Sequence, residues 1–120
     1  MKAIVRYHYG SPEVLEFREL DKPVVDDKTV LVRVRAASLN SGDLESLYGK
    51  PLIARGTGLR KPRNRGLGVD VAGVVEAVGK AVTEFHPGDE VFGDLTQHGL
   101  GAFAEYVCAP PLAFAVKPAR

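Results

Sequence analysis

Asn40, Asp43 and Tyr48 place an amide, a carboxylate and a phenol in one short segment of the chain. Such groups can hold a ligand in position through hydrogen bonds. Each also has an ordinary structural explanation. Asn40 is a good helix cap, Asp43 suits the first turn of a helix, where the dipole favours negative charge, and the ring of Tyr48 could pack in the core. The residue types alone leave both explanations open.

Histidine and cysteine form no pattern that is typical of a catalytic or metal site. The three histidines are separate in the sequence and have no neighbouring nucleophile or carboxylate partner, so we expect them at the surface. The single cysteine rules out an internal disulfide, and we expect it to pack in a strand, as free cysteines usually do. These residues also lack the Cys and His spacing of a structural zinc site. They are His8, His86, His98 and Cys108.

The segment 50–66 is rich in basic residues and glycine and contains no acidic residue. It is too rich in structure breakers to be a regular element, and long loops in compact domains are often functional. It could attract a phosphate-bearing cofactor or an anionic substrate, or it could be a solvated loop. Nucleic-acid contact is disfavoured because aromatic residues are absent among its charges and the whole chain is not basic.

The composition fits one domain with a sizeable core, since the chain has 120 residues and 45% hydrophobic content. The formal net charge of +1 gives no field that would attract nucleic acid or an anionic membrane. The sequence has no apolar run of the roughly 20 residues that a spanning helix needs, and its first residues do not resemble a signal peptide. We therefore expect a soluble, cytoplasmic protein.

Short apolar segments separated by glycine and proline predict a mainly β fold. The third strand should turn Val30, Val32 and Val34 to the core and leave Leu31 on a mixed face. One short helix is predicted over 40–48, because it has a capping residue at its start and Gly49 and Pro51 after its end. The predicted strands are 2–8, 15–20, 29–36, 71–78, 90–95, 102–109 and 112–116.

Four motifs in this order resemble the catalytic, GroES-like domain of the medium-chain dehydrogenase/reductase superfamily, and its zinc-free quinone oxidoreductase branch above all. The resemblance implies a GroES-like irregular β-barrel with a few short helices over residues 1–120. It also implies a C-terminal Rossmann domain that is absent from this chain. The motifs are Ala-Ser-Leu-Asn-Ser-Gly-Asp at 37–43, Leu-Gly-Val-Asp-Val-Ala-Gly-Val-Val-Glu at 67–76, Pro-Gly-Asp-Glu-Val-Phe-Gly at 87–93 and Gly-Ala-Phe-Ala-Glu-Tyr-Val at 101–107.

The resemblance also implies roles for individual residues. Asn40 stands where zinc-dependent members have a cysteine ligand, and Val69 stands where they have a histidine. Valine cannot bind zinc, so no zinc is expected. The amide of Asn40 would hydrogen-bond the cofactor ribose or the substrate carbonyl, Asp43 would assist positioning, and Tyr48 would make a weaker polar contact. The segment 50–66 would influence the choice of substrate.

The implied function is that of the substrate-side domain of an NAD(P)H-dependent oxidoreductase that transfers hydride to a quinone or an α,β-unsaturated carbonyl. NAD(P)H would be bound mainly by the missing domain, so the isolated chain should be inactive, and the full-length enzyme could be a homodimer. Two alternatives remain open. One is a zinc-type alcohol dehydrogenase with other ligands. The other is a non-enzymatic GroES-like module such as a co-chaperonin, although the dehydrogenase motifs argue against it.

Overall fold

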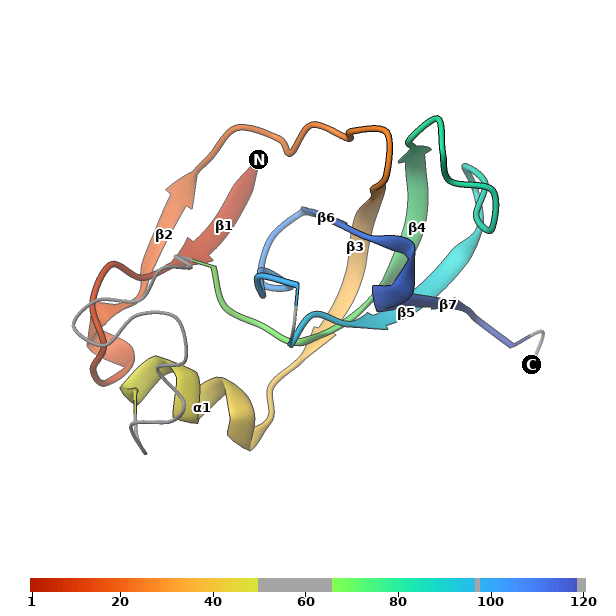
Figure 1. The fold of residues 1–120 in the computed structure, drawn as a ribbon. Helices are drawn as coiled ribbons and strands as arrows, with labels where there is room; N and C mark the ends of the chain where they lie inside the picture. The colour runs from red at the N-terminus through yellow and green to blue at the C-terminus, as the bar shows by residue number, and fades with distance from the viewer. Residues whose placement is uncertain (50–65, 97, 119–120) are drawn as a thin grey trace.

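The computed structural model describes residues 1–49, 66–96 and 98–118 of the chain (Figure 1). Its fold is mainly β with a few short helices, as the sequence predicts. The strands are β1 (Lys2–Val5), β2 (Glu16–Glu19), β3 (Val30–Ser38), β4 (Asp70–Val78), β5 (Glu90–Asp94), β6 (Tyr106–Ala109) and β7 (Phe114–Val116). In the described ranges the helices are α1 (Ser41–Tyr48) and two 3-10 turns, Pro12–Val14 and Pro111–Ala113.

The strands form two antiparallel sheets that do not close into one continuous barrel within the described residues. The larger sheet has the order β6-β3-β4-β5-β7, and the smaller sheet is the hairpin of β1 and β2. Isolated bridges from Ala3 to Ala104 and from Val5 to Gly66 join the hairpin to the rest of the chain. In Figure 1 the five-stranded sheet is strongly curved, and α1 follows the end of β3.

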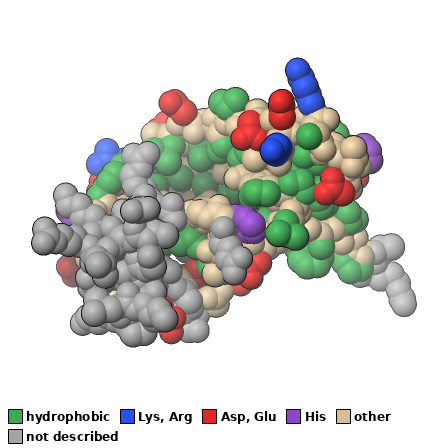
Figure 2. Space-filling model, viewed as in Figure 1, with side chains coloured by type: hydrophobic (Ala, Val, Ile, Leu, Met, Phe, Trp, Pro, Cys, Tyr) green, Lys and Arg blue, Asp and Glu red, His purple; other side chains and the backbone are tan. Residues whose placement is uncertain are grey.

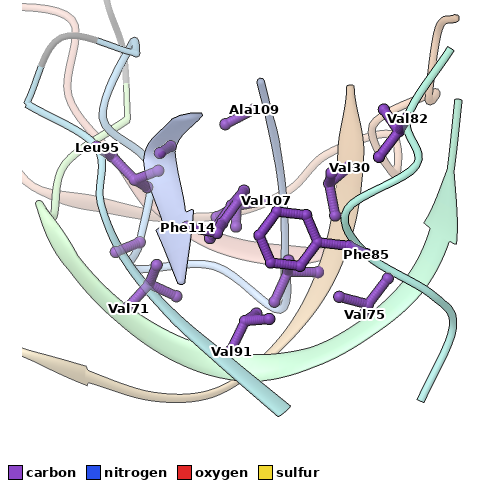
Figure 3. Close-up of a cluster of buried hydrophobic side chains, with 13 residues drawn as sticks. Val30, Val71, Val75, Val82, Phe85, Val91, Leu95, Val107, Ala109 and Phe114 are labelled. Carbon is purple, nitrogen blue, oxygen red and sulfur yellow. The ribbon is translucent and has the colours of Figure 1, made fainter. Parts of the chain in front are cut away.

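The hydrophobic core lies against the concave side of the five-stranded sheet (Figure 3). The rings of Phe85 and Phe114 meet edge to face, with centroids 6.5 Å apart and an interplanar angle of 84°. Pairs of this geometry stabilise a fold beyond the area that they bury. The valines of β3, β4, β5 and β6 complete the cluster, so consecutive strands are held by one shared core.

The prediction for β3 is correct for Val30 and Val32, which are fully buried, but it is wrong for Leu31, which is only 5% exposed. Leu31 pairs with Ala77 and Cys108 on the neighbouring strands. The connection between β2 and β3 passes over this side of the sheet. Within this connection, Thr29 Oγ1 lies 3.2 Å and the carbonyl oxygen of residue 24 lies 3.9 Å from the Cys108 sulfur. Both faces of this part of β3 are therefore covered.

Three predicted strands lose two or more residues at one end in the structure. The first ends at Val5 instead of 8. Residues 102–105 fall outside β6, because the backbone of Phe103 bonds both Leu67 and Ile4 instead of following one ladder. Residues 111–113 form a 3-10 turn before β7, consistent with the two prolines at 110–111, which cannot donate to a sheet.

Two glycines have clear structural reasons. Gly88 has φ of +96° in the Pro-Gly-Asp turn, which the Asp89 carboxylate stabilises by accepting the His86 backbone N–H at 2.9 Å. Gly73 lies where β3 and β4 approach closely, and a Cβ there would be 2.2 Å from the Arg33 carbonyl oxygen. The motif around Gly73 is thus explained by strand packing.

Figure 2 shows acidic and basic side chains scattered among hydrophobic ones on one face of the molecule. Charges of both signs are mixed there, in keeping with the near-neutral composition. Among the helices in the described part of the chain, none has the length and apolar character to cross a membrane.

Candidate functional site at the start of the helix

The first turn of α1 is fixed by a reciprocal pair of hydrogen bonds. The Asp43 carboxylate accepts the backbone N–H of Asn40 at 2.8 Å, and the backbone N–H of Asp43 donates to the carbonyl of Asn40 at 3.1 Å. Asp43 makes the contact that Glu or Gln makes in a capping box, but the other bond runs to the backbone carbonyl of Asn40 and not to its side chain. The backbone of Asn40 is thus held at the start of α1 by Asp43, while its side chain bonds Asp70.

Asp43 is unusual for a carboxylate because it is only 4% exposed. One of its oxygens, Oδ2, is bonded to Asn40, while Oδ1 is buried and has no hydrogen-bond partner among the residues that the structure describes. An unpaired buried oxygen costs free energy, so a structural cap alone would be better served by an exposed side chain. Asp43 therefore holds the backbone N–H of Asn40 from a position that is shielded from bulk water.

The side chain of Asn40 points to β4, where its Nδ2 donates to Asp70 Oδ2 at 2.8 Å. The hydroxyl of Ser38 donates to the same oxygen at 3.3 Å. Ser38 is the last residue of β3 and Asp70 the first of β4, and the two are directly paired in the sheet. The strand register therefore brings a hydroxyl and an amide to one carboxylate.

A shallow groove of about 260 Å³ begins at this cluster and runs over the ends of β3, β4 and β5. Its walls are mostly apolar, and Phe92, which is 48% exposed, contributes an aromatic ring. Apolar walls with a few polar groups at one end are typical of small-molecule sites. The lining residues are Ala36, Ala37, Ser38, Asp70, Val71, Ala72, Phe92 and Gly93.

A larger cavity of about 380 Å³ lies between the β1–β2 hairpin and β6. Its lining includes Ile4, Phe103, Tyr106 and Cys108, and it shares no lining residue with the groove. Two further hollows, of about 390 and 460 Å³, are also larger than the groove, so size does not single out one site. We favour the groove because it is lined by the carboxylate that holds the amide of Asn40.

Tyr48 lies at the opposite end of α1 from Asn40, about 12 Å along the helix axis at 1.5 Å per residue. Its side chain is 40% exposed, and Leu44 on the same side of the helix is also exposed, while Leu47 is buried. The apolar side suggested by the sequence is thus divided between core and surface. The structure brings Asn40 and Asp43 together but leaves Tyr48 apart from them.

Two contacts at this site were not predicted, that of Ser38 with Asp70 and that of Asp70 with Asn40. Ser38 and Asp70 lie just outside the predicted strands 29–36 and 71–78, and their pairing depends on the register of β3 and β4. The basic segment 50–66 lies outside the described residues except for Gly66.

One further set of ionisable residues lies beside this region, at the end of β5, and another lies in the turn before β5. Asp94 pairs with Asp70 across β4 and β5, and the hydroxyl and then the backbone N–H of Thr96 lower the pKa of Asp94 by hydrogen bonding its charged form. His86 has a carboxylate neighbour after all, because its Nδ1 is 3.9 Å from Asp89 Oδ2 in the turn before β5. His86 is exposed, as expected.

The described residues contain no cluster of three or more His, Cys, Asp or Glu side chains that could hold a metal ion. Val69 precedes Asp70, and its carbonyl accepts the backbone N–H of Leu95 at 2.9 Å. Its side chain offers no donor atom for a metal. The chemistry available at the start of α1 is therefore hydrogen bonding by Asn40, whose backbone N–H donates to Asp43 and whose side-chain amide donates to Asp70.

Comparison with known proteins agrees with this architecture. A quinone oxidoreductase of Lama guanicoe is 39% identical over 111 residues, which cover 91% of this chain and 31% of the relative. The chloroplastic NADPH-dependent alkenal/one oxidoreductase of Arabidopsis thaliana is 35% identical over 125 residues, covering 98% and 31%. The crystal structure of a quinone oxidoreductase from Pseudomonas syringae pv. Tomato DC3000 superposes with a TM-score of 0.83 at 32% identity, covering 98% of this chain and 34% of that one.

This chain thus spans about a third of the length of the proteins it matches. The family model of the alcohol dehydrogenase GroES-like domain matches residues 26–119, which include α1, the groove and five of the seven strands. From the fold and this match, the chain belongs to the alcohol dehydrogenase GroES-like domain family, in the quinone oxidoreductase branch of the medium-chain dehydrogenase/reductase superfamily.

Proposed function

We propose that this chain is the substrate-side domain of a zinc-independent oxidoreductase that transfers hydride from NAD(P)H to a quinone or an α,β-unsaturated carbonyl. The observation that carries the proposal is the amide of Asn40, held by Asp70 beside an apolar groove. The names of the relatives support the reaction class, since they describe reduction of quinones and of alkenals and alkenones.

The rest of the machinery would be supplied by a C-terminal Rossmann domain. The relatives are about three times as long as the aligned region, which leaves room for such a domain in each of them. Residues 1–120 would then form one domain, and the dinucleotide would be bound mainly by the other. The nicotinamide of that dinucleotide supplies the hydride when it is bound.

The residues at the start of α1 fit the polar part of such a cofactor. Asn40 is exposed, its backbone is held by Asp43, and its amide is held by Asp70. A side chain held at both ends loses little further freedom when it binds a ligand, so it orients that ligand at low entropic cost. Asn40 would contact the cofactor or substrate directly, and Asp43 would act through Asn40.

The groove would hold the flat, apolar part of the substrate and keep water away from it. Phe92 and the alanines of β3 and β4 offer apolar contact there, and Ser38 and Asp70 supply the polar end. With an asparagine and a valine where the zinc-dependent branch carries metal ligands, no Lewis acid is expected to polarise the substrate oxygen. The substrate must therefore be electron-poor already, which favours quinones and enones over simple alcohols and ketones.

Tyr48 has a lesser place in the proposal. Its partly exposed ring could line the outer part of a substrate pocket, but it is too distant from Asn40 along α1 to share one contact point with it. We propose that Tyr48 and the segment 50–66 affect which substrate is accepted and have no part in the hydride transfer itself.

The test compares the 120-residue chain with the full-length protein that contains it. Oxidation of NADPH and of NADH is followed at 340 nm with a benzoquinone and with an enone as acceptors. We expect turnover by the full-length protein and none by the 120-residue chain. Robust turnover by the short chain alone would overturn the two-domain account.

Metal content is measured on the same full-length preparation, purified without chelator. We expect less than about 0.1 zinc per chain and activity that survives dialysis against a chelator, because valine cannot replace the histidine ligand. Stoichiometric zinc, lost together with activity on chelation, would refute the zinc-independent mechanism and favour a zinc-type alcohol dehydrogenase.

A further inference from the structure

We propose that His98 donates the proton that completes the reduction, from a hollow beside the groove that holds the substrate. The inference rests on the proposed function, because hydride transfer to a quinone or an enone leaves an anion that must be protonated. The sequence predicts surface positions for all three histidines. His8 and His86 are exposed, as predicted, but His98 is half-buried.

His98 lines the hollow of about 390 Å³ at the end of β5. Asp94, on the wall of this hollow, is paired directly with Asp70, on the wall of the groove, across β4 and β5. Directly opposed residues of antiparallel strands have their Cβ atoms about 4.5–5.5 Å apart. The hollow and the groove therefore adjoin at this pair, which puts His98 beside a substrate whose flat part lies in the groove. The other lining residues of the hollow are Thr96, Leu112 and Ala113.

The turn that carries His98 is held in a strained conformation. Leu100 has φ of +60°, which is uncommon for a residue other than glycine, and Gly99 and Gly101 on either side of it also have positive φ. The carbonyl of Leu95 accepts the backbone N–H of His98 at 3.0 Å and that of Leu100 at 3.2 Å. Strain of this kind persists only where the surrounding structure imposes it, and it is concentrated at functional sites. The backbone of His98 is therefore fixed, although it lies in a turn.

Asp94 supplies a negative charge beside the imidazole. Its carboxylate accepts the Thr96 hydroxyl at 2.5 Å and the Thr96 backbone N–H at 2.8 Å. These hydrogen bonds lower the pKa of Asp94, and the positive charge of His98 makes a smaller contribution in the same direction. Asp94 is thus ionised at neutral pH. It is the one ionisable neighbour of His98 among the described residues that line the hollow, and its strand partner Asp70 lies next to it.

The proposed step is a proton transfer from the protonated imidazole to the reduced substrate. Hydride transfer turns the substrate into a hydroquinone anion or an enolate. One N–H bond of the imidazole then breaks, and its proton goes to the oxygen of the hydroquinone anion or to the α-carbon of the enolate. The imidazole is left neutral and takes a new proton from water, which reaches it because His98 is only half-buried. Histidine suits this task because it is the residue type that ordinarily changes its charge near neutral pH.

The experiment compares His98→Gln with His86→Gln in the full-length protein. Glutamine is polar but cannot release a proton. We expect His98→Gln to lower kcat for an enone about 100-fold, the lower end of what general acid catalysis contributes. The loss with a benzoquinone should be smaller, because a hydroquinone anion is a weaker base than an enolate and is protonated by water more readily. His86→Gln is the matched control and should leave both kcat values within twofold of the parent.

The pH profile separates a proton donor from a structural residue. In the parent, kcat for the enone should fall as pH rises through the titration of the imidazole, because only the protonated form donates. His98→Gln should abolish this fall. Equal losses with both acceptors, together with an unchanged pH profile, would assign His98 a structural role and refute the inference.

The position of His98 beside Asp94 is tested without turnover. His98→Gln should raise the pKa of Asp94, followed by NMR titration of its carboxyl carbon, because a positive charge that helps to lower this pKa is lost. His86→Gln should leave that pKa unchanged. If the two variants give the same pKa for Asp94, or if His98→Gln retains the parental turnover, the inference fails and the proposed function stands. If the full-length protein reduces neither acceptor, the proposed function itself fails.

Discussion

Replacing Gly73 by alanine tests how closely β3 and β4 approach beside the candidate site. The added Cβ would lie 2.2 Å from the Arg33 carbonyl oxygen and 2.9 Å from a Val32 methyl group. Because contacts below 3.0 Å are essentially never seen for a real Cβ, the strands must separate by about 0.8 Å or more. The carbonyl belongs to the backbone of a central strand, so it cannot rotate away as a flexible side chain would.

The expected destabilisation follows from two opposing effects. Overpacking of a well-packed core costs about 1–3 kcal/mol, and we expect the upper end because backbone must move. Alanine also restricts the unfolded chain, which stabilises the fold by about 0.5 kcal/mol. The free energy of unfolding should therefore fall by about 2.5 kcal/mol, a large part of the 5–15 kcal/mol that is typical of a domain. The corresponding fall in Tm is about 10 °C.

Urea unfolding followed by circular dichroism measures this change in the 120-residue chain. Gly88→Ala is the matched control, because a Cβ at Gly88 meets nothing within 4 Å but would adopt the positive φ of the turn. That variant should lose only about 1 kcal/mol. If Gly73→Ala were neutral, or milder than Gly88→Ala, the close approach of the strands would be refuted.

Three further predictions concern the cap, the core and the acid response. Asp43→Ala should lower the free energy of unfolding by about 1 kcal/mol in urea, because the first turn of α1 loses its cap, whereas exposed Glu45→Ala should change it little. Phe85→Ala should cost about 3–5 kcal/mol by the same assay, because it empties a buried edge-to-face contact with Phe114, and a loss no larger than that of exposed Phe92→Ala would contradict the core assignment. Thr96→Val should raise the pKa of Asp94, measured by NMR titration of its carboxyl carbon, because the hydroxyl that lowers this pKa is lost. Since a lowered pKa stabilises the fold above the unfolded pKa of about 4 and this contribution is lost as pH falls through the folded value, the variant should lose less stability on acidification. An unchanged pKa would show that the backbone N–H of Thr96 alone holds the carboxylate.

Local sequence signals predicted the elements well but not the contacts between them. The helix over 40–48 was foreseen because its cap and its glycine stop lie within the segment itself, and the structure places α1 at Ser41–Tyr48. The alternation of valines foresaw the buried face of β3. Burial of Leu31 could not be foreseen, because it depends on a connection that crosses the sheet from outside.

The candidate site also combines local contacts, which the sequence predicts, with contacts between distant residues, which it does not. Asn40 and Asp43 were identified from one segment, and their mutual hydrogen bonds are local. The bond from Asn40 to Asp70 joins residues 30 positions apart and depends on the register of β3 against β4, which includes two shifts. A shift of one residue in that register would move Asp70 to the other face of the sheet. The contact therefore belongs to the tertiary structure and not to a motif.

The attachment of β1 to residues 103–105 also sets how long β1 lacks its partner while the chain is being synthesised. The N–H of Ile4 donates to the carbonyl of Phe103, and the N–H of Glu105 donates to the carbonyl of Lys2. On a ribosome that adds about 5–20 residues per second, the first strand waits on the order of 5–20 s for this partner. During that interval its hairpin has an uncovered edge, and contacts of such long sequence separation also slow folding itself. A newly made chain should therefore be most vulnerable to proteolysis and to aggregation just before residue 105 emerges.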